Sequence, residues 1–354
     1  MAYTTIDKPT DYFNTKIYTG NGVNSTDSQS ITGVGFQPNW VWIKNRDTTN
    51  WHILSDSVRG GNKVLYTNRT DAERSDVDWY LQTFDSDGFT VGYSGDTNGN
   101  GNSLVSWNWL AGGTASSNSD GSITSSVSAN TTAGFSIVSY TGSATNPSTV
   151  GHGLGTAPSM IIVKNRSTSG RDWVIWHKAL GGASSTADLL LFTTDAKITS
   201  SGYWGSSAPS STTFGVGNIN NNNANGDNHI AYCFAEKKGY SKFGSYTGNG
   251  NSNGTFVYTG FKPAWVLIKN YGAGGDSWQL QDIKRSGYNG ANNVLAPNTN
   301  GAEGSNGLDI LSNGFKIRTT ASGWNSGNVG YIYMAFAAEP LVANVGESIP
   351  ATAR

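Results

Sequence analysis

The sequence predicts an all-β protein made of three tandem antiparallel β-sandwich domains of the jelly-roll or lectin-like kind. The chain has 46 Gly, 12 Trp and only 13% charged residues, a composition typical of strands joined by tight turns. One apolar stretch, residues 33–45, recurs at 153–165 and at 259–270. Because strand signals follow one another at intervals of roughly 8–12 residues, each recurrence indicates one sandwich.

The recurring stretch is expected to be the central strand of each unit. Every copy has a Gly-rich approach, a Pro, an apolar run and a closing Lys-Asn pair. Alternate residues of a strand point to opposite faces, so Trp40 and Trp42 share one face while Val41 and Ile43 share the other. Neither face is suited to water, which predicts a strand buried on both sides.

Two further markers support real repeats. Tyr-Thr-Gly begins at positions 18, 140 and 246, and Lys-Asn begins at positions 44, 164 and 269. The order Asp71-Ala72-Glu73 also has counterparts beginning at Asp195 and Gly301. Repeats of roughly a hundred residues are domain-sized, so we expect each to hold its own core.

These markers set the expected boundaries. Pro9 is expected to prevent a helix in the N-terminal arm. Residues 113–133, between the first two repeats, have almost no bulky apolar residue, which is typical of a linker. The predicted parts are the arm (1–10), repeat 1 (11–112), a Ser/Thr/Gly-rich linker (113–133), repeat 2 (134–239), repeat 3 (242–340) and a C-terminal tail (341–354).

Charge and hydropathy exclude several classes of protein. The net charge is -1 and no basic stripe is visible, which disfavours nucleic-acid binding. No segment approaches 18 apolar residues and the first residues lack a secretion signal, so membrane insertion is not expected. Cys233 is the only cysteine; it excludes an internal disulfide, and we expect it to be buried.

No set of residues predicts catalysis. Asp56, His177 and Asp282 occupy comparable points of the three repeats, but a position that changes from Asp to His is a poor general acid. We expect these residues to bond backbone groups at strand ends. The histidines are scattered and no nucleophile elbow is present, so the chain is predicted not to be an enzyme.

One run resembles half of a calcium loop. Asp96–Gly101 places oxygen-bearing residues at the first, third and fifth positions and Gly at the sixth. The twelfth position is Trp107, where such a loop needs a bidentate Glu. The run is therefore predicted to be a turn, and no metal or cofactor is expected.

Two aromatic pairs are the candidate ligand-binding residues. Trp79-Tyr80 and Tyr203-Trp204 lie in polar, loop-like surroundings, where aromatic rings can stack on sugars or anchor a protein partner. Alternatively, they close the open end of each sandwich as minor core. The third repeat has Leu308–Leu311 at this place, so the feature is not common to all repeats.

Several runs resemble a family of three-repeat virion structural proteins from marine bacteriophages and cyanophages. These runs are Tyr246–Gly250, Val257–Val266 and Tyr331–Ala337, together with Asp11–Lys16 and Ser128–Phe135. The resemblance covers all three repeats. It implies a structural protein on the exterior of the phage head or tail, and it brings no catalytic residues with it.

We therefore expect a non-enzymatic virion protein, made in the host cytoplasm and displayed as a capsid decoration or a tail or fibre component. Its partners would be other virion proteins, and it would be oligomeric or present in many copies. The alternative is a lectin-like receptor-binding protein that recognises a host surface glycan. A polysaccharide depolymerase is disfavoured because no carboxylate pair recurs.

Overall fold

The computed structural model describes residues 4–75, 79–181, 188–205, 208–286, 289 and 291–342. Strands form nearly all of its regular structure, and they pair antiparallel in the sheets. The helices in these ranges are single turns: η1 (Pro9–Asp11), α1 (Gly95–Asn98), α2 (Asn220–Asn223) and α3 (Ser322–Asn325). The all-β prediction is confirmed.

Sheet group 1 consists of a main sheet and a small sheet. The main sheet has the order β1 (Phe13–Thr19), β9 (Ser103–Trp109), β3 (Trp40–Asn45), β4 (Ile53–Asp56), β5 (Lys63–Tyr66) and β6 (Arg74–Ser75). The small sheet has the order β2 (Gln29–Thr32), β8 (Gly88–Val91) and β7 (Leu81–Asp85).

Sheet group 2 has the largest main sheet. Its order is β10 (Ser116–Asn118), β11 (Ser125–Asn130), β12 (Phe135–Thr141), β19 (Asn228–Phe234), β14 (Met160–Asn165), β15 (Val174–His177), β16 (Asp188–Leu191) and β17 (Ile198–Thr199). The small sheet pairs β13 (Ser148–Gly151) with β18 (Thr213–Val216).

Sheet group 3 consists of two four-stranded sheets. The main sheet has the order β20 (Ser241–Thr247), β27 (Gly330–Pro340), β22 (Phe261–Asn270) and β23 (Gln279–Asp282). The other has the order β21 (Phe256–Tyr258), β26 (Gly314–Ile317), β25 (Gly304–Leu311) and β24 (Ala291–Val294).

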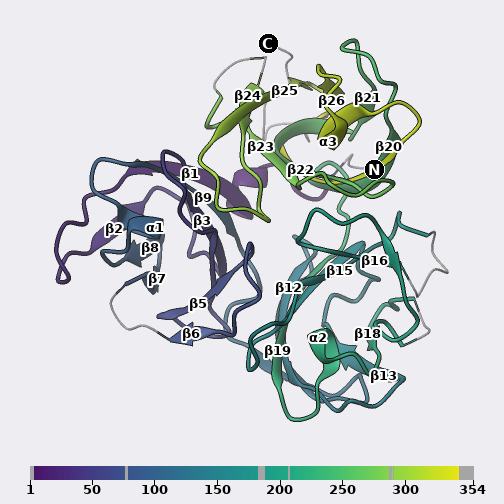
Figure 1. The fold of residues 1–354 in the computed structure, drawn as a ribbon. Helices are drawn as coiled ribbons and strands as arrows, with labels where there is room; N and C mark the ends of the chain where they lie inside the picture. Colours follow the sequence, from purple (N-terminus) through teal and green to yellow (C-terminus); the bar gives the residue numbers. More distant parts are fainter. Residues whose placement is uncertain are drawn as a thin grey trace.

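The same strand order recurs in the three main sheets. In each case the recurring order begins with one strand, β1, β12 or β20, which is called the first strand of its group. β1-β9-β3-β4, β12-β19-β14-β15 and β20-β27-β22-β23 each place the last long strand of the group between this first strand and the recurring apolar strand. The recurring stretch of the sequence forms β3, β14 and β22, which lie inside their sheets rather than at an edge. Figure 1 shows the three groups side by side around a common centre, in purple to blue, teal, and green to yellow.

One hydrophobic core lies at this centre and is shared by all three groups. It contains Trp40 and Trp109 of group 1, Phe234 of group 2, and Trp265 and Phe336 of group 3. The rings of Trp109 and Trp265 meet edge to face with centroids 5.5 Å apart. Three further clusters lie one to a group, on the other faces of the main sheets. Each group therefore has a core of its own on the outer face of its main sheet and shares a further core with the other two on the inner face.

The two faces of β3 confirm the interpretation of its sequence. Trp40 and Trp42 belong to the shared core, whereas Val41 and Ile43 belong to the outer cluster of group 1. All four side chains are at most 1% exposed. Their burial on both faces follows from the interior position of β3 in a sheet with a core on each side.

Two expectations about the connections need correction. Residues 113–133 contain β10 and β11, and β11 pairs with β12 over six residues. Mostly small residues suffice there, because backbone pairing holds β11 between β10 and β12, and only two bulky residues, Ile123 and Val127, reach the outer core of group 2. In the arm, Pro9 begins η1 instead of preventing it. Proline is tolerated in the first turn of a helix, where its missing N–H would have no partner in the helix.

The Lys-Asn pair fastens the loop that follows each recurring strand. In group 1, Lys44 donates to the carbonyl oxygens of Asn45 and Thr48 at 2.6 and 3.1 Å, and Asn45 donates to the carbonyl of Gly95 in α1 at 2.8 Å. The lysines of all three pairs are fully buried, and this burial lowers each pKa to about 8. The motif is structural in every copy.

Candidate functional site

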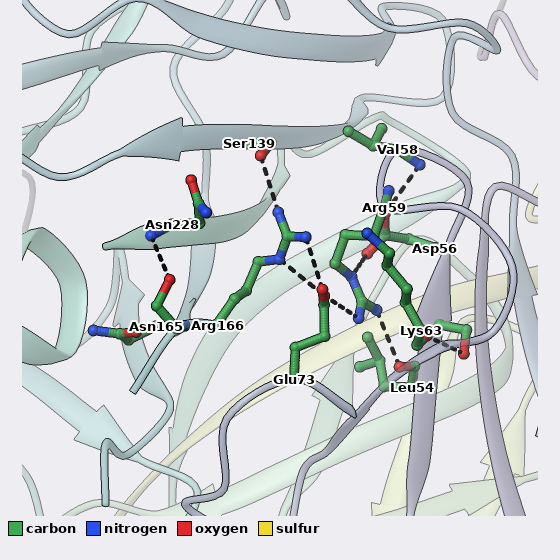
Figure 2. Close-up of polar contacts among 12 residues, drawn as sticks. Leu54, Asp56, Val58, Arg59, Lys63, Glu73, Ser139, Asn165, Arg166 and Asn228 are labelled. Atoms are coloured by element: carbon green, nitrogen blue, oxygen red, sulfur yellow. Dashed lines mark hydrogen bonds and ion pairs between the residues drawn. The ribbon is translucent and has the colours of Figure 1, made fainter. Parts of the chain in front are cut away.

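Charged side chains join sheet groups 1 and 2. Arg59, three residues after β4 ends, donates to Asp56 at 2.5 Å and to Glu73 at 3.1 Å. Glu73 also accepts two bonds of 2.9 Å from Arg166 of group 2. Figure 2 shows Glu73 lying between the two guanidinium groups. Burial raises the pKa of Glu73, but the two arginines outweigh it and hold that pKa below its usual value.

Asp56 is positioned by the turn at the end of β4. Its Oδ1 accepts from the backbone N–H of Val58 and Arg59 at 3.1 and 2.9 Å. Its Oδ2 accepts from the hydroxyl of Tyr232, across the junction, at 2.7 Å. The prediction that this strand-end residue bonds backbone is confirmed, and the residue also holds a side chain of the neighbouring group.

The same arrangement joins groups 3 and 1. Arg285 donates to Asp282 at 2.6 Å and to Glu303 at 2.9 Å, and Glu303 accepts bonds of 2.9 and 2.8 Å from Arg46. Asp282 accepts backbone bonds from the two residues of the turn after β23 and a 2.9 Å bond from the indole N–H of Trp107.

At the junction of groups 2 and 3 a histidine takes the place of the aspartate. His177 accepts a turn N–H through Nδ1 at 3.1 Å and meets the carbonyl of Tyr333 through Nε2 at 3.2 Å. Complete burial lowers the pKa of His177 to about 3, so it is neutral. Leu180 stands where the other groups have Arg59 and Arg285. Without an arginine, a buried aspartate would lack its counter-charge, which explains the change to histidine.

A backbone bond repeats at all three junctions. The N–H of Glu73 donates to the carbonyl of Arg166 at 2.8 Å, and that of Lys197 donates to Tyr271 at 2.9 Å. The N–H of Glu303 donates to Arg46 at 2.7 Å. Group 1 is thus bonded to group 2, group 2 to group 3, and group 3 back to group 1. The chain closes a ring around the shared core.

The four candidate ligand-binding aromatics lie in different environments. The side chain of Trp79 is 42% exposed, and the guanidinium carbon of Arg74 lies 5.1 Å from its ring centroid. Tyr203 is half-buried. Tyr80 and Trp204 are only 3% and 2% exposed and belong to the outer clusters of groups 1 and 2. The structure does not bring the two pairs together.

Backbone bonds explain this difference. Gly92 and Gly217 donate to the carbonyls of Tyr80 and Tyr203, each at 2.7 Å, so these tyrosines are equivalent and the two pairs are offset by one residue. Trp204 therefore takes the inward position that Leu81 takes in group 1.

The half calcium loop is a helical turn. Asp96 lies in α1, accepts the backbone N–H of Trp51 at 2.8 Å, and is largely buried, which raises its pKa. Asn98 accepts the N–H of Asn21 at 2.8 Å. No group of three or more His, Cys, Asp or Glu side chains is placed to hold a metal within the described ranges. Cys233 is fully buried as expected, and its burial raises the pKa of the thiol.

A cavity of about 290 Å³ opens where the three groups meet. Asn68, Thr193 and Asn298 contribute to its wall from groups 1, 2 and 3, and Asp172 and Trp173 contribute from just before β15. The carboxamides of Asn68 and Asn298 accept backbone N–H groups at 3.1 and 2.9 Å. Polar and apolar groups both line the cavity, and these bonds hold two of its wall residues in place.

The junction residues were missed at the sequence level. The sequence pattern points to Asp56 and Asp282 but assigns no role to Arg59, Glu73 or Arg166. A signal was available, because an Arg follows three residues after each Asp and not after His177. That covariation indicates a buried ion pair between the Asp and the Arg. The further bonds through Glu73 to Arg166 of the next group have no local signature in the sequence.

None of the described helices is long and apolar enough to cross a membrane. No curated protein and no solved structure matches the chain significantly. A single family model spans all three sheet groups, in keeping with their shared core. The chain belongs to the family described as a domain of unknown function (DUF7483), whose model matches residues 8–340.

Proposed function

We propose that the protein is a non-enzymatic structural component of a bacteriophage virion, displayed on the particle exterior as a capsid decoration or a tail or fibre component. It acts by assembly with other virion proteins, in several copies. The sequence resemblance to virion proteins of marine phages and cyanophages supports this location. In this proposal the three sheet groups are three tandem β-sandwich repeats of the jelly-roll or lectin-like kind, each with a main sheet packed on a second sheet.

The observation that carries the proposal is the use of the polar side chains. Asp56, Asp282 and His177 each bond a turn and the neighbouring sheet group, and the buried lysines bond loop carbonyls. The groups best suited to acid–base chemistry thus hold the ring together. A ring closed by such bonds around one core suits a protein whose task is to keep its shape outside a cell.

Antibody–gold labelling of intact particles, viewed by electron microscopy, tests the location. Label spread over the head would indicate a decoration protein, and label confined to the tail would indicate a tail or fibre component. Intact particles that take up no label, while disrupted particles also lack the protein, would overturn the proposal.

A lectin-like receptor-binding function is the second candidate. The exposed ring of Trp79, beside Arg74, and the cavity where the three groups meet favour it. Binding to an array of bacterial surface glycans would test it with the full chain. Trp79→Ala should abolish such binding, whereas Phe256→Ala, which removes an aromatic ring of similar exposure on β21, should not. Trp204→Ala is unsuitable because it removes core.

A further inference from the structure

The three main sheets differ at the outer edge of their first strand. In β1, the N–H of Leu110 donates to Tyr12 and the N–H of Gly20 donates to Asn102, both at 2.9 Å. Bonding residues alternate along an antiparallel strand. The N–H and C=O groups of Phe13, Thr15 and Ile17 therefore point away from β9, toward the open edge.

The corresponding edge in group 2 is covered by the chain itself. β11 pairs with β12 in a register that sets Asn130 opposite Phe135 and Ser128 opposite Ile137. Phe135 and Ile137 are the counterparts of Phe13 and Thr15, because Phe135 pairs with Phe234 as Phe13 pairs with Trp109. The edge of a first strand in this fold thus accepts an extended segment of small residues.

The corresponding edge in group 3 is capped by a side chain. The backbone N–H of Phe243, the counterpart of Thr15 by the same register, donates to the carboxylate of Glu236 at 3.3 Å. Lys178 and Lys242 hold this carboxylate at 2.6 and 2.8 Å. A charged cap of this kind protects an edge from pairing.

The edge of β1 has neither protection. Across the residues that the structure describes, the backbone N–H groups of Phe13, Thr15 and Ile17 have no hydrogen-bond partner. The side-chain oxygen of Thr15 is also buried without a partner, in a residue only 7% exposed. Ile17 is 44% exposed. Buried polar groups are normally bonded, so this edge calls for a partner.

A groove of about 190 Å³ runs beside these groups. Thr15 lines one side, and Ala264, Ile283 and Lys284 of group 3 line the other. The equivalent groove between groups 1 and 2 is lined by Asn39 and Ser57, with Ser126 of β11 in place of first-strand residues. Ser126 of β11 thus lines that groove in the place where Thr15 of β1 lines the groove beside group 3.

We propose that the edge of β1 is a docking site for an extended segment of a partner protein, made of small and hydroxyl-bearing residues like those of β11. The segment adds to the main sheet of group 1 as an antiparallel strand, and its backbone meets Phe13, Thr15 and Ile17. This deepens the proposed assembly function by naming its contact. The bonds made at the edge are mainly with backbone, so the segment is selected by extension and small size.

The chain supplies the probe. A fluorescein-labelled peptide with the sequence of residues 122–131 should bind the full-length protein saturably in a fluorescence-anisotropy titration. In β11 the N–H of Ser128 faces β12 and that of Val127 faces β10. In the bound peptide the N–H of Ser128 should therefore face β1, and that of Val127 should face away from it. Ser128→Pro in the peptide should weaken binding about tenfold or more, and Val127→Pro should leave it within about twofold.

Hydrogen exchange locates the contact. Bound peptide should slow amide exchange in residues 13–19 and leave 135–141 unchanged. In the protein, Ile17→Pro removes an outward N–H without touching the ladder to β9 and should abolish binding, whereas Ile17→Val should retain it. Absence of binding, equal affinity of the two proline peptides, or protection elsewhere would overturn the inference. Particle labelling tests the proposed function separately, so the two failures are distinguishable.

Discussion

Glu73 is the best position at which to test the junctions. Its carboxylate accepts three bonds from two arginines, and the side chains of Glu73, Arg59 and Arg166 are 11%, 0% and 14% exposed. Glu73→Gln keeps the shape but removes the charge and one acceptor oxygen. Hydrogen bonds to charged groups contribute about 1.5–3 kcal/mol each. Arg59 keeps Asp56 and Arg166 can regain some water, so we expect the free energy of unfolding to fall by about 2–4 kcal/mol.

Urea unfolding at pH 7, followed by tryptophan fluorescence, measures this change. The control is Asp309→Asn, which breaks the 3.2 Å ion pair between Asp309 and Arg318. The side chains of these two residues are 25% and 47% exposed. That change should cost less than about 1 kcal/mol. A double-mutant cycle with Arg166→Gln should show coupling between Glu73 and Arg166. Equal effects of Glu73→Gln and Asp309→Asn, or no coupling, would refute the assignment of Glu73 as a bridge.

The effect of Glu73→Gln should depend on pH. The folded protein lowers the pKa of Glu73, so its stabilisation is present above the unfolded-state pKa and is lost as pH falls through the lower, folded value. The difference in unfolding free energy between the parent and the variant should therefore shrink below about pH 4. A difference that stays constant to pH 3 would mean that packing, not charge, is responsible.

Three further predictions follow from the buried groups. The pKa of each buried lysine is lowered to about 8, so above that pH the unfolded chain binds more protons than the folded one. The free energy of unfolding should therefore rise from pH 8 to 9, by about 1 kcal/mol per lysine. In urea titrations Lys164→Met should reduce this rise by about a third, and an unchanged rise would contradict the prediction. Trp204→Ala should lower the free energy of unfolding by about 3–5 kcal/mol and Trp79→Ala by much less. Equal losses would mean that the two rings are equally buried. Asn325 donates to three oxygens and accepts the N–H of Asn249, so Asn325→Ala should lower the thermal midpoint, while an unchanged midpoint in calorimetry would show that water replaces the amide.

The strands were predictable because their signals are local. Alternation in residues 40–45 indicates a strand buried on both faces, and the backbone-bonding role of Asp56 follows from its type and its place after a strand. The linker prediction failed for the opposite reason. β11 is held by backbone pairing with β12, and backbone pairing leaves no trace in the hydrophobic pattern.

The junctions could not be predicted from spacing alone. Glu73 and Arg166 are separated by 93 residues, yet two bonds join their side chains. The shared core could not be predicted either. Strand alternation accounts for the burial of Trp109 and of Trp265 separately, and only the arrangement of the sheets shows that the two rings meet. The exposed position of Trp79 and the buried one of Trp204 depend on a one-residue offset that the backbone bonds reveal.

The closed ring has a consequence for damage by proteases. A cut in a surface loop ordinarily frees the part of a chain beyond it, but here each sheet group is held by both of its neighbours and by the common core. A chain nicked once between groups would keep all three parts together, because the bonds at the junctions and the shared core still hold each group to the other two. Such a protein would keep its folded shape after its backbone is no longer continuous.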